Sequence, residues 1–320
     1  MRVLWSHNFR TGHSNAGCFM HTTANALRDA GINLQVEYLG DLRSIWAIRR
    51  ARRKVRTLAR GFDIVHSQYG SVCAFASLGS NKPFAITLRG NDWNLHKATF
   101  HWLWAHTRLA RWTTEVVLGS NPVVTAVSGR IAAEVLEKFP GLTVEVIPAA
   151  IDLNRWVPRS APPATRRQAP RVLFTASNPR DPIKGYDLFE RTIRRAQERI
   201  PSLVPVVATG VSHEDMPTLV ASCDVVLCTS ETEGWPNSIK EALACNIPFV
   251  STDVSDLAAV AAVEETTCRV CPNDHIALSD ALCAVLSGPP PTDLRRHVAC
   301  MDLKPTAARL VAVYQQMLKA

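Results

Sequence analysis

The chain has 320 residues, 47% of them hydrophobic, and a formal net charge of +8. This length suits two domains of about 150 residues, each with its own core, and the composition excludes a disordered or fibrous protein. The longest apolar runs have the length of strands, well short of the roughly 20 residues that span a bilayer. The N-terminus lacks the apolar region of a secretory signal, so we expect a cytoplasmic protein.

Cysteines and histidines are numerous but show no metal-binding pattern. The nine cysteines are an odd number spread over the whole chain, which favours reduced thiols over a secreted disulfide scaffold. Cys268 and Cys271 form a single Cys-x-x-Cys pair, whereas a structural zinc site needs four ligands. The ten histidines are equally dispersed. The sequence therefore predicts no metal site.

Much of the positive charge lies in one segment, residues 48–60 (IRRARRKVRTLAR). Read as a helix, the segment places cations on several faces and leaves a narrow apolar stripe at Ile48, Val55 and Ala59. One interpretation is a solvated helix in an arginine-rich protein. The other is a patch for anionic lipid headgroups or for a polyanionic acceptor such as a nucleic acid, at about 1 kcal/mol per basic residue near a charged membrane.

Short apolar runs alternate with helical patterns along both halves of the chain. Such alternation predicts an α/β protein whose parallel sheets carry helices on both faces. We therefore expect two Rossmann-like domains that face a cleft, with ligands at the carboxyl ends of the strands. A proline-rich stretch without apolar periodicity marks a linker between them. The expected parts are an N-terminal domain over 1–156, the linker over 157–170, a second domain over 171–303 and a C-terminal helix over 304–320.

Residues 230–244 (SETEGWPNSIKEALA) place Glu233 and Glu241 on either side of a Gly-Trp-Pro-Asn turn. Pro236 suits the first position of a helix, where its missing N–H has no consequence. The amides that follow, together with the helix dipole, would bind a phosphate. Glu241 shares a helical face with the start of the helix, where a carboxylate suits a pair of ribose hydroxyls. The phosphate-binding amides belong to Asn237, Ser238 and Ile239.

Other polar residues follow the predicted strands. Lys184 follows a strand and opens a helix, and Arg180 lies four residues before it. Cations at this position would neutralise a diphosphate leaving group. In the first half, the polar segments SHNFRTGHSNAG and RGNDWN also follow strands, so they are expected to contact a ligand.

Together these segments resemble a known family. SETEGWPNSIKEALACNIPFVSTDV resembles the motif of the family 4 retaining glycosyltransferases, nucleotide-sugar-dependent enzymes of the GT-B fold, in which two glutamates seven residues apart precede a strand. RVLFTASNPRDPIKGYDLF is similar to the phosphate segment of the family. FDIVHSQYG, VVTAVSGRIAAEVL and VIPAAIDLNRWVP are similar to further segments. Their order and spacing extend the resemblance over most of the chain.

The resemblance implies roles in holding a nucleotide sugar. Glu241 would hold the ribose, and Glu233 with the backbone after it, at Gly234, would contact the sugar hydroxyls. Lys184, with Arg180, would bind the diphosphate and stabilise it as it leaves. The second domain would thus bind the donor, and the N-terminal domain would bind the acceptor.

The resemblance also implies how the reaction proceeds. Gly17 matches a glycine of the first loop, which approaches the phosphates in the family. Members generally need no metal and keep the anomeric configuration, with the departing phosphate oxygen taking the acceptor proton. No protein base is then required, and we expect neither a metal nor another cofactor.

Two departures from the family pattern stand out. Arg89-Gly90-Asn91-Asp92 replaces a His-Gly-x-Asp segment, so an arginine occupies the position of the histidine near the sugar. We take Arg89 and Asp92 as candidate catalytic residues. The stretch from Leu203 to Asp224 lacks the additional strand and base-contacting loop that the family usually has there.

Four further side chains are candidates for lining the acceptor or sugar pocket, and core packing is the alternative for the two tryptophans. These residues are His7, His13, Trp93 and Trp235.

We therefore expect a retaining glycosyltransferase that moves a sugar from a nucleoside diphosphate sugar to a glycan, lipid-linked or other acceptor. Its location would be cytoplasmic, or peripheral at the inner face of the membrane if residues 48–60 bind lipid. Three alternatives remain open: transfer to nucleic acid bases, epimerisation of the nucleotide sugar, and binding of a nucleotide sugar without catalysis.

Overall fold

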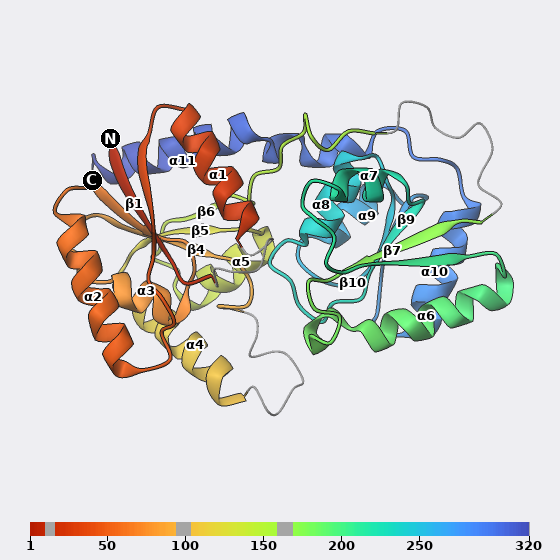
Figure 1. The fold of residues 1–320 in the computed structure, drawn as a ribbon, viewed down its shortest axis with the longest axis horizontal. Helices are drawn as coiled ribbons and strands as arrows, with labels where there is room; N and C mark the ends of the chain where they lie inside the picture. The colour runs from red at the N-terminus through yellow and green to blue at the C-terminus, as the bar shows by residue number, and fades with distance from the viewer. Residues whose placement is uncertain (10–16, 94–103, 159–168, 320) are drawn as a thin grey trace. The chain divides into compact units, whose positions relative to one another are not determined.

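The structure is a computed structural model that describes residues 1–9, 17–93, 104–158 and 169–319, and the chain divides into two compact units (Figure 1). Unit 1 comprises Met1–Ala150 and Met301–Ala320, and unit 2 comprises Ile151–Cys300. Most of the predicted linker and the candidate His13 lie outside the described residues. Each unit contains one parallel sheet with helices on both faces, which confirms the predicted α/β class.

Unit 1 contains a six-stranded sheet in the order β2-β1-β3-β4-β5-β6. The order reverses between β1 and β3, because the chain first moves from β1 to β2 and then crosses back over β1. Such a reversal opens a crevice at the carboxyl ends of the two strands, where ligands bind in open α/β sheets. The strands are β1 (Arg2–His7), β2 (Asn33–Tyr38), β3 (Ile64–Ser67), β4 (Phe84–Leu88), β5 (Val123–Ala126) and β6 (Val144–Val146).

The helices of unit 1 cover the two faces of this sheet. Val3 and Trp5 of β1 pack towards α1 and α11, while the alternate residue Leu4 packs towards α2 and α3. Figure 1 shows α1 and α11 side by side, so the C-terminal helix belongs to the same unit as the N-terminal half. The helices are α1 (Cys18–Asp29), α2 (Ile45–Ala59), α3 (Ser71–Ser77), α4 (Trp104–Leu118), α5 (Gly129–Lys138) and α11 (Leu303–Met317).

Unit 2 contains a five-stranded sheet in the order β11-β10-β9-β7-β8. Its order reverses between β7 and β9, so the loops after these two strands meet at one crevice. The strands are β7 (Arg171–Thr175), β8 (Val204–Ala208), β9 (Val225–Cys228), β10 (Phe249–Thr252) and β11 (Cys268–Cys271).

The core of unit 2 lies between this sheet and the helices α6 and α10, where Val172 and Phe174 of β7 meet Phe189 and Leu282. The helices are α6 (Tyr186–Arg199), α7 (Met216–Ala221), α8 (Asn237–Ala244), α9 (Leu257–Val263) and α10 (His275–Ser287), with 3₁₀ turns η3 (Pro182–Lys184) and η4 (Leu294–Met301). Across the described ranges, no helix combines the length and apolar character needed to cross a bilayer.

A buried chain of hydrogen bonds ties α11 to the sheet of unit 1. The Trp5 Nε1–H donates to the Tyr314 hydroxyl at 2.8 Å, and this hydroxyl lies 2.7 Å from His66 Nδ1. Because the indole only donates, the hydroxyl hydrogen is left for Nδ1, so His66 carries its proton on Nε2 and donates to Thr87 at 2.8 Å. Burial, with the charge of Arg89, lowers the pKa of His66 to about 3, so its ring is neutral.

Replacing Tyr314 with phenylalanine should destabilise unit 1 by about 3 kcal/mol, because it leaves the Trp5 N–H and His66 Nδ1 buried without partners. Chemical denaturation would measure the loss. Tyr38→Phe is the matched control, because no hydrogen bond of the Tyr38 hydroxyl is found in the described part of the chain. Equal stability of the two variants would contradict the proposed network.

The basic segment forms a helix that begins three residues before the predicted range, at Ile45, with the Ser44 hydroxyl accepting the Ala47 N–H. Its buried side is a narrow stripe of Ala51, Val55 and Ala59. The helix therefore packs on unit 1 through small side chains, and its arginines are exposed except Arg52, which is half-buried.

Candidate functional site

The loops after β7 and β9 pack directly against each other at the crevice of unit 2. The Thr229 hydroxyl is 3.0 Å from the Lys184 carbonyl oxygen and 2.9 Å from that of Gly185, and the Glu231 N–H donates to the Ile183 carbonyl at 2.8 Å. These contacts fix the place where α6 begins relative to the turn that precedes α8.

Gly185 is required at this contact for two reasons. Its φ of +63° lies in the left-handed region, and a Cβ atom would lie 2.2 Å from the Thr229 carbonyl oxygen.

Gly185→Ala should therefore cost on the order of 3 kcal/mol of stability, measured by thermal or denaturant unfolding. Gly210→Ala is the matched control, because Gly210 has a φ of +68° but no atom within 4 Å of its Cβ position. Similar losses in both variants would contradict a steric requirement at Gly185.

Lys184 and Glu233 meet across these loops. The Lys184 ammonium donates to Glu233 Oε1 at 2.5 Å, and the Ser230 hydroxyl donates to the same oxygen at 2.8 Å. Burial lowers the pKa of Lys184, but the Glu233 carboxylate more than offsets this and raises it above its ordinary value. Lys184 is therefore a permanent cation that, with Ser230, holds the Glu233 side chain in one orientation.

The turn after Glu233 leads into α8. Pro236 is the N-cap residue, and Asn237, Ser238 and Ile239 form the first turn, whose amides have no intrahelical acceptors. Asn237 is exposed and Ser238 is half-buried, whereas the Ile239 side chain is fully buried. The beginning of α8 can therefore receive an anion, while Ile239 anchors the helix in the core.

Glu241 lies one turn into α8 and is half-buried. Desolvation raises its pKa from an ordinary 4.5 to about 8, although the nearby charges of Lys240 and Arg155 act in the opposite direction. Within the described ranges, neither a hydrogen bond nor an ion pair reaches its carboxyl group. A desolvated carboxylate without such a partner is costly unless it is protonated or bound, which makes Glu241 a candidate ligand group.

The other predicted residues of unit 2 are placed differently. Arg180 is exposed, and only its backbone N–H makes a contact, with Asn178 Oδ1 at 3.1 Å, in the part of the chain that the structure describes. It does not join the pair of Lys184 and Glu233. Gly234 is buried, and its carbonyl accepts the Ser255 hydroxyl at 2.6 Å.

Arg89 and Asp92 lie in unit 1, after β4. The Arg89 guanidinium donates to the backbone carbonyl and to the side-chain oxygen of Gln68, each at 2.7 Å, and lies 4.7 Å from the centre of the Phe19 ring. Burial lowers the pKa of Arg89 to about 10, so the side chain remains charged at neutral pH. Gln68 follows β3, which places this contact at the carboxyl ends of neighbouring strands.

Asp92 is buried and ties the loops after β3 and β4 together. It accepts the backbone N–H of Gly70 at 2.7 Å, of Arg89 at 2.9 Å and of Gly90 at 3.0 Å. Burial raises the pKa of Asp92 despite these bonds. Gly70 has no room for a side chain, because a Cβ atom would lie 2.9 Å from Asp92 Cβ. In this structure Asp92 positions the backbone beneath Arg89.

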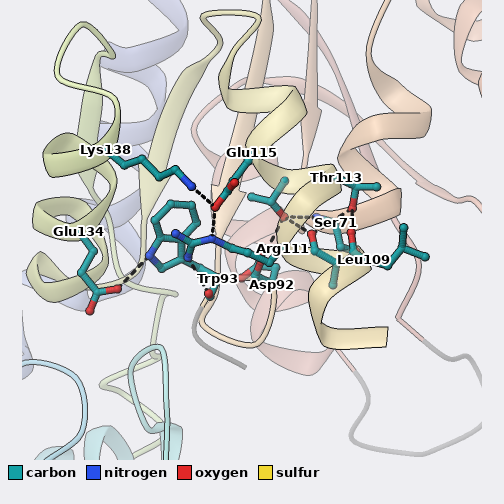
Figure 2. Close-up of polar contacts among 11 residues, drawn as sticks. Ser71, Asp92, Trp93, Leu109, Arg111, Thr113, Glu115, Glu134 and Lys138 are labelled. Atoms are coloured by element: carbon teal, nitrogen blue, oxygen red, sulfur yellow. Dashed lines mark hydrogen bonds and ion pairs between the residues drawn. The ribbon is translucent and has the colours of Figure 1, made fainter. Parts of the chain in front are cut away.

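Trp93, the next residue, is locked in a polar cluster (Figure 2). Its indole N–H donates to Glu134 at 3.0 Å, and the Arg111 guanidinium lies 3.1 Å from the centre of the ring. Glu115 accepts from Arg111 at 2.5 Å and from Lys138 at 2.6 Å. Trp93 is almost fully buried, so it packs in the core.

The remaining candidates are His7, Gly17 and Trp235. His7 ends β1 and is buried, and burial, together with the charge of His21, lowers its pKa to about 4. Gly17 is the N-cap of α1 with a φ of +78°, a backbone conformation that favours glycine. Trp235 is buried in the turn before α8.

Two residues of the site were missed by the sequence reasoning. Ser230 donates to Glu233, and Gln68 accepts from Arg89. Both follow strands that flank the reversal in strand order, β9 and β3 respectively. Polar residues immediately after these strands were the available signal.

Comparison with protein families gives two matches that together span most of the chain. The model described as Glycosyltransferase Family 4 matches residues 19–155, and the model described as Glycosyl transferases group 1 matches residues 169–288. A similar curated protein is described as a teichuronic acid biosynthesis glycosyltransferase, TuaC of Bacillus subtilis (strain 168). It is 23% identical over 224 residues, which cover 62% of this chain and 55% of TuaC.

Solved structures support the same fold over the whole chain. A sucrose-phosphate synthase from Thermosynechococcus elongatus has a TM-score of 0.79 at 15% identity, covering 99% of both chains. HepE of Anabaena, in complex with UDP and glucose, has a TM-score of 0.68 at 15% identity, covering 99% of this chain and 100% of HepE. At these identities the likeness concerns the fold alone. From the family matches and this fold, the chain belongs to the family 4 glycosyltransferases of the GT-B type, as its motifs predict.

Proposed function

We propose that this glycosyltransferase moves a sugar from a nucleoside diphosphate sugar to a glycan or glycolipid acceptor, with retention of configuration and without a metal ion. The observation that carries the proposal is the contact of Lys184 with Glu233 in the loops that lead into the first turn of α8. A cation, a carboxylate and helix amides at one crevice suit the diphosphate and the hydroxyls of such a donor.

Each group would have a separate part in the reaction. The α8 amides and Lys184 would bind the diphosphate and stabilise the negative charge that develops as it leaves, with Arg180 as a second cation. Glu241 would hold the ribose, and Glu233 would orient the sugar through its hydroxyls. A phosphate oxygen of the leaving group would take the acceptor proton on the same face of the sugar, so retention requires no protein base.

Unit 1 would supply the acceptor side. We assign Arg89 to contacts with the donor or the acceptor, and Asp92 to holding the loop from which Arg89 extends. Gly17 would allow the backbone at the start of α1 to approach the phosphates. The described ranges contain no group of three or more histidine, cysteine or acidic side chains arranged to hold a metal ion.

Similar proteins support this class of substrates. HepE was solved with UDP-glucose, and TarM of S. aureus with UDP and α-GlcNAc-glycerol. TuaC is named for teichuronic acid biosynthesis, and WaaB is named as a lipopolysaccharide outer core galactosyltransferase. We therefore favour a glycan or glycolipid acceptor over nucleic acid bases, and we keep a cytoplasmic location as part of the proposal.

The test is incubation with UDP-, GDP- and TDP-sugars, with and without glycan and glycolipid acceptors. We expect release of one nucleoside diphosphate and, by NMR, a product with the anomeric configuration of the donor. No release from any donor would overturn the proposal. A changed donor sugar without an acceptor would instead indicate an epimerase, and donor binding without turnover would indicate a binding protein.

A further inference from the structure

The outward side of α2 combines an aromatic residue with unpaired cations. Trp46 is 72% exposed at the beginning of the helix, next to exposed Ile45. Arg50, Arg53 and Arg60 follow on the same side, opposite the buried stripe of the helix. These three arginines have no ion pair with any described residue, whereas the neighbouring Lys54 is paired with Glu37.

A second exposed apolar stripe lies on α4. Leu109, Trp112 and Val116 recur at helical spacing on one side, and Trp112 is 57% exposed. The opposite side of the helix, with Val117 and Leu118, is buried against unit 1. The stripe is therefore not needed for the core of the unit.

The two helices belong to one layer of unit 1. The chain passes from β2 to β3, from β3 to β4 and from β4 to β5 in the same direction across the sheet, whereas it passes from β1 to β2 in the opposite direction. Because such crossovers are right-handed, α2, α3 and α4 lie on one face of the sheet and α1 lies on the other. The helix α3 contacts both α2 and α4, and Figure 1 shows the three helices as neighbours. Their exposed sides therefore point away from the same face of the sheet.

The chemistry of this surface fits one occupant. We propose that the α2–α4 surface, consisting of Trp46, Arg50, Arg53, Arg60, Leu109 and Trp112, docks the protein on an anionic lipid bilayer. Arginines would meet the headgroups, and the tryptophans with Leu109 would enter the interface, where amphipathic aromatic side chains are favoured. A nucleic acid would use the arginines but would leave the aliphatic side chains exposed. A second copy of the surface would bring like charges together.

This inference deepens the proposed function, because docking would present the enzyme to an acceptor carried in the membrane. The docking itself does not depend on the identity of the donor. Binding to vesicles and sugar transfer are therefore separate observations.

The test is co-sedimentation of the full chain with vesicles of phosphatidylcholine containing phosphatidylglycerol, compared with phosphatidylcholine alone. We expect binding to the anionic vesicles only, weakened by salt. The triple variant R50Q, R53Q, R60Q should bind on the order of 100-fold more weakly, at about fivefold per cation. The matched control is R191Q, R194Q, R269Q, which removes three exposed charges from unit 2 and should bind as the wild type does.

The apolar part of the α2–α4 surface is tested with the double variant L109S, W112S. Its control is the double variant V263S, I276S, which removes two exposed apolar side chains from unit 2. Only the first pair should weaken vesicle binding, and all variants should keep the wild-type melting temperature.

The proposal is overturned if the wild type does not sediment with anionic vesicles, or if control and surface variants lose binding equally. A DNA mobility shift without vesicle binding would assign the arginines to a polyanion instead. Vesicle binding without nucleoside diphosphate release would support the docking and reject the proposed function.

Discussion

Lys184→Met is expected to lower kcat by about 100- to 1000-fold, the scale for loss of one preorganised group that stabilises charge in a transition state. Methionine keeps the length and apolar stem of lysine but removes the ammonium that contacts Glu233. The departing diphosphate would then develop its charge without the nearest cation, and Glu233 would keep only the Ser230 hydroxyl. Steady-state kinetics with the donor identified by the sugar panel would measure the effect.

Lys54→Met is the control for this variant. Lys54 also forms an ion pair, with Glu37, but on α2 in unit 1. Surface pairs of this kind contribute about 1 kcal/mol or less to stability, so this variant should keep wild-type turnover. If Lys184→Met retained full kcat, leaving-group stabilisation would have to be assigned to another residue.

Donor affinity is expected to rise about tenfold per pH unit as pH increases towards 8 and to level off above it. Burial raises the pKa of Glu241 to about 8, so the free protein holds this group mostly protonated at pH 7. Two ribose hydroxyls donate best to an ionised carboxylate, so binding would release a proton below pH 8. Titration calorimetry in two buffers of different ionisation enthalpy would measure this release, and Glu241→Gln should abolish it.

The raised pKa of Glu241 also predicts how the stability of the free protein depends on pH. Between the ordinary pKa of 4.5 and the folded value of about 8, the native state holds a proton that the unfolded chain has lost. The free energy of unfolding should therefore fall as pH rises through this window. Glu241→Gln mimics the protonated form, so its melting temperature should match the wild type at pH 4 and exceed it at pH 8. Equal melting temperatures at both pH values would contradict the raised pKa.

The alternation of apolar runs predicted the fold class, because buried parallel strands and amphipathic helices have distinct patterns. It also placed Lys184 and Glu233 after strands. Their direct contact depends on β7 and β9 being neighbours in the sheet, which the alternation does not specify. The resemblance to the family indicated indirectly that the two residues are close, because it assigned both of them to the same nucleotide sugar.

Other site residues were harder to predict because their surroundings come from distant parts of the chain. Asp92 accepts an N–H from Gly70, a contact between two loops that sequence patterns do not connect. For Trp93 the sequence allows either a place in the ligand pocket or packing in the core. Its burial depends on contacts with Arg111 and Glu134, which come from later helices. The hydrogen bonds from α11 to Trp5 and His66 likewise depend on a residue that is distant in the sequence, Tyr314.

Calorimetric titration of UDP, GDP and TDP into three proteins tests most directly whether the beginning of α8 holds a nucleoside diphosphate. We expect the wild type to bind one of them. Glu241→Ala should bind it about 10- to 100-fold more weakly, since charge-assisted hydrogen bonds are lost. Glu233→Ala should bind it nearly as well as the wild type, because its carboxylate would act on the sugar. Binding of no nucleotide, or equal binding by all three proteins, would contradict the assignment.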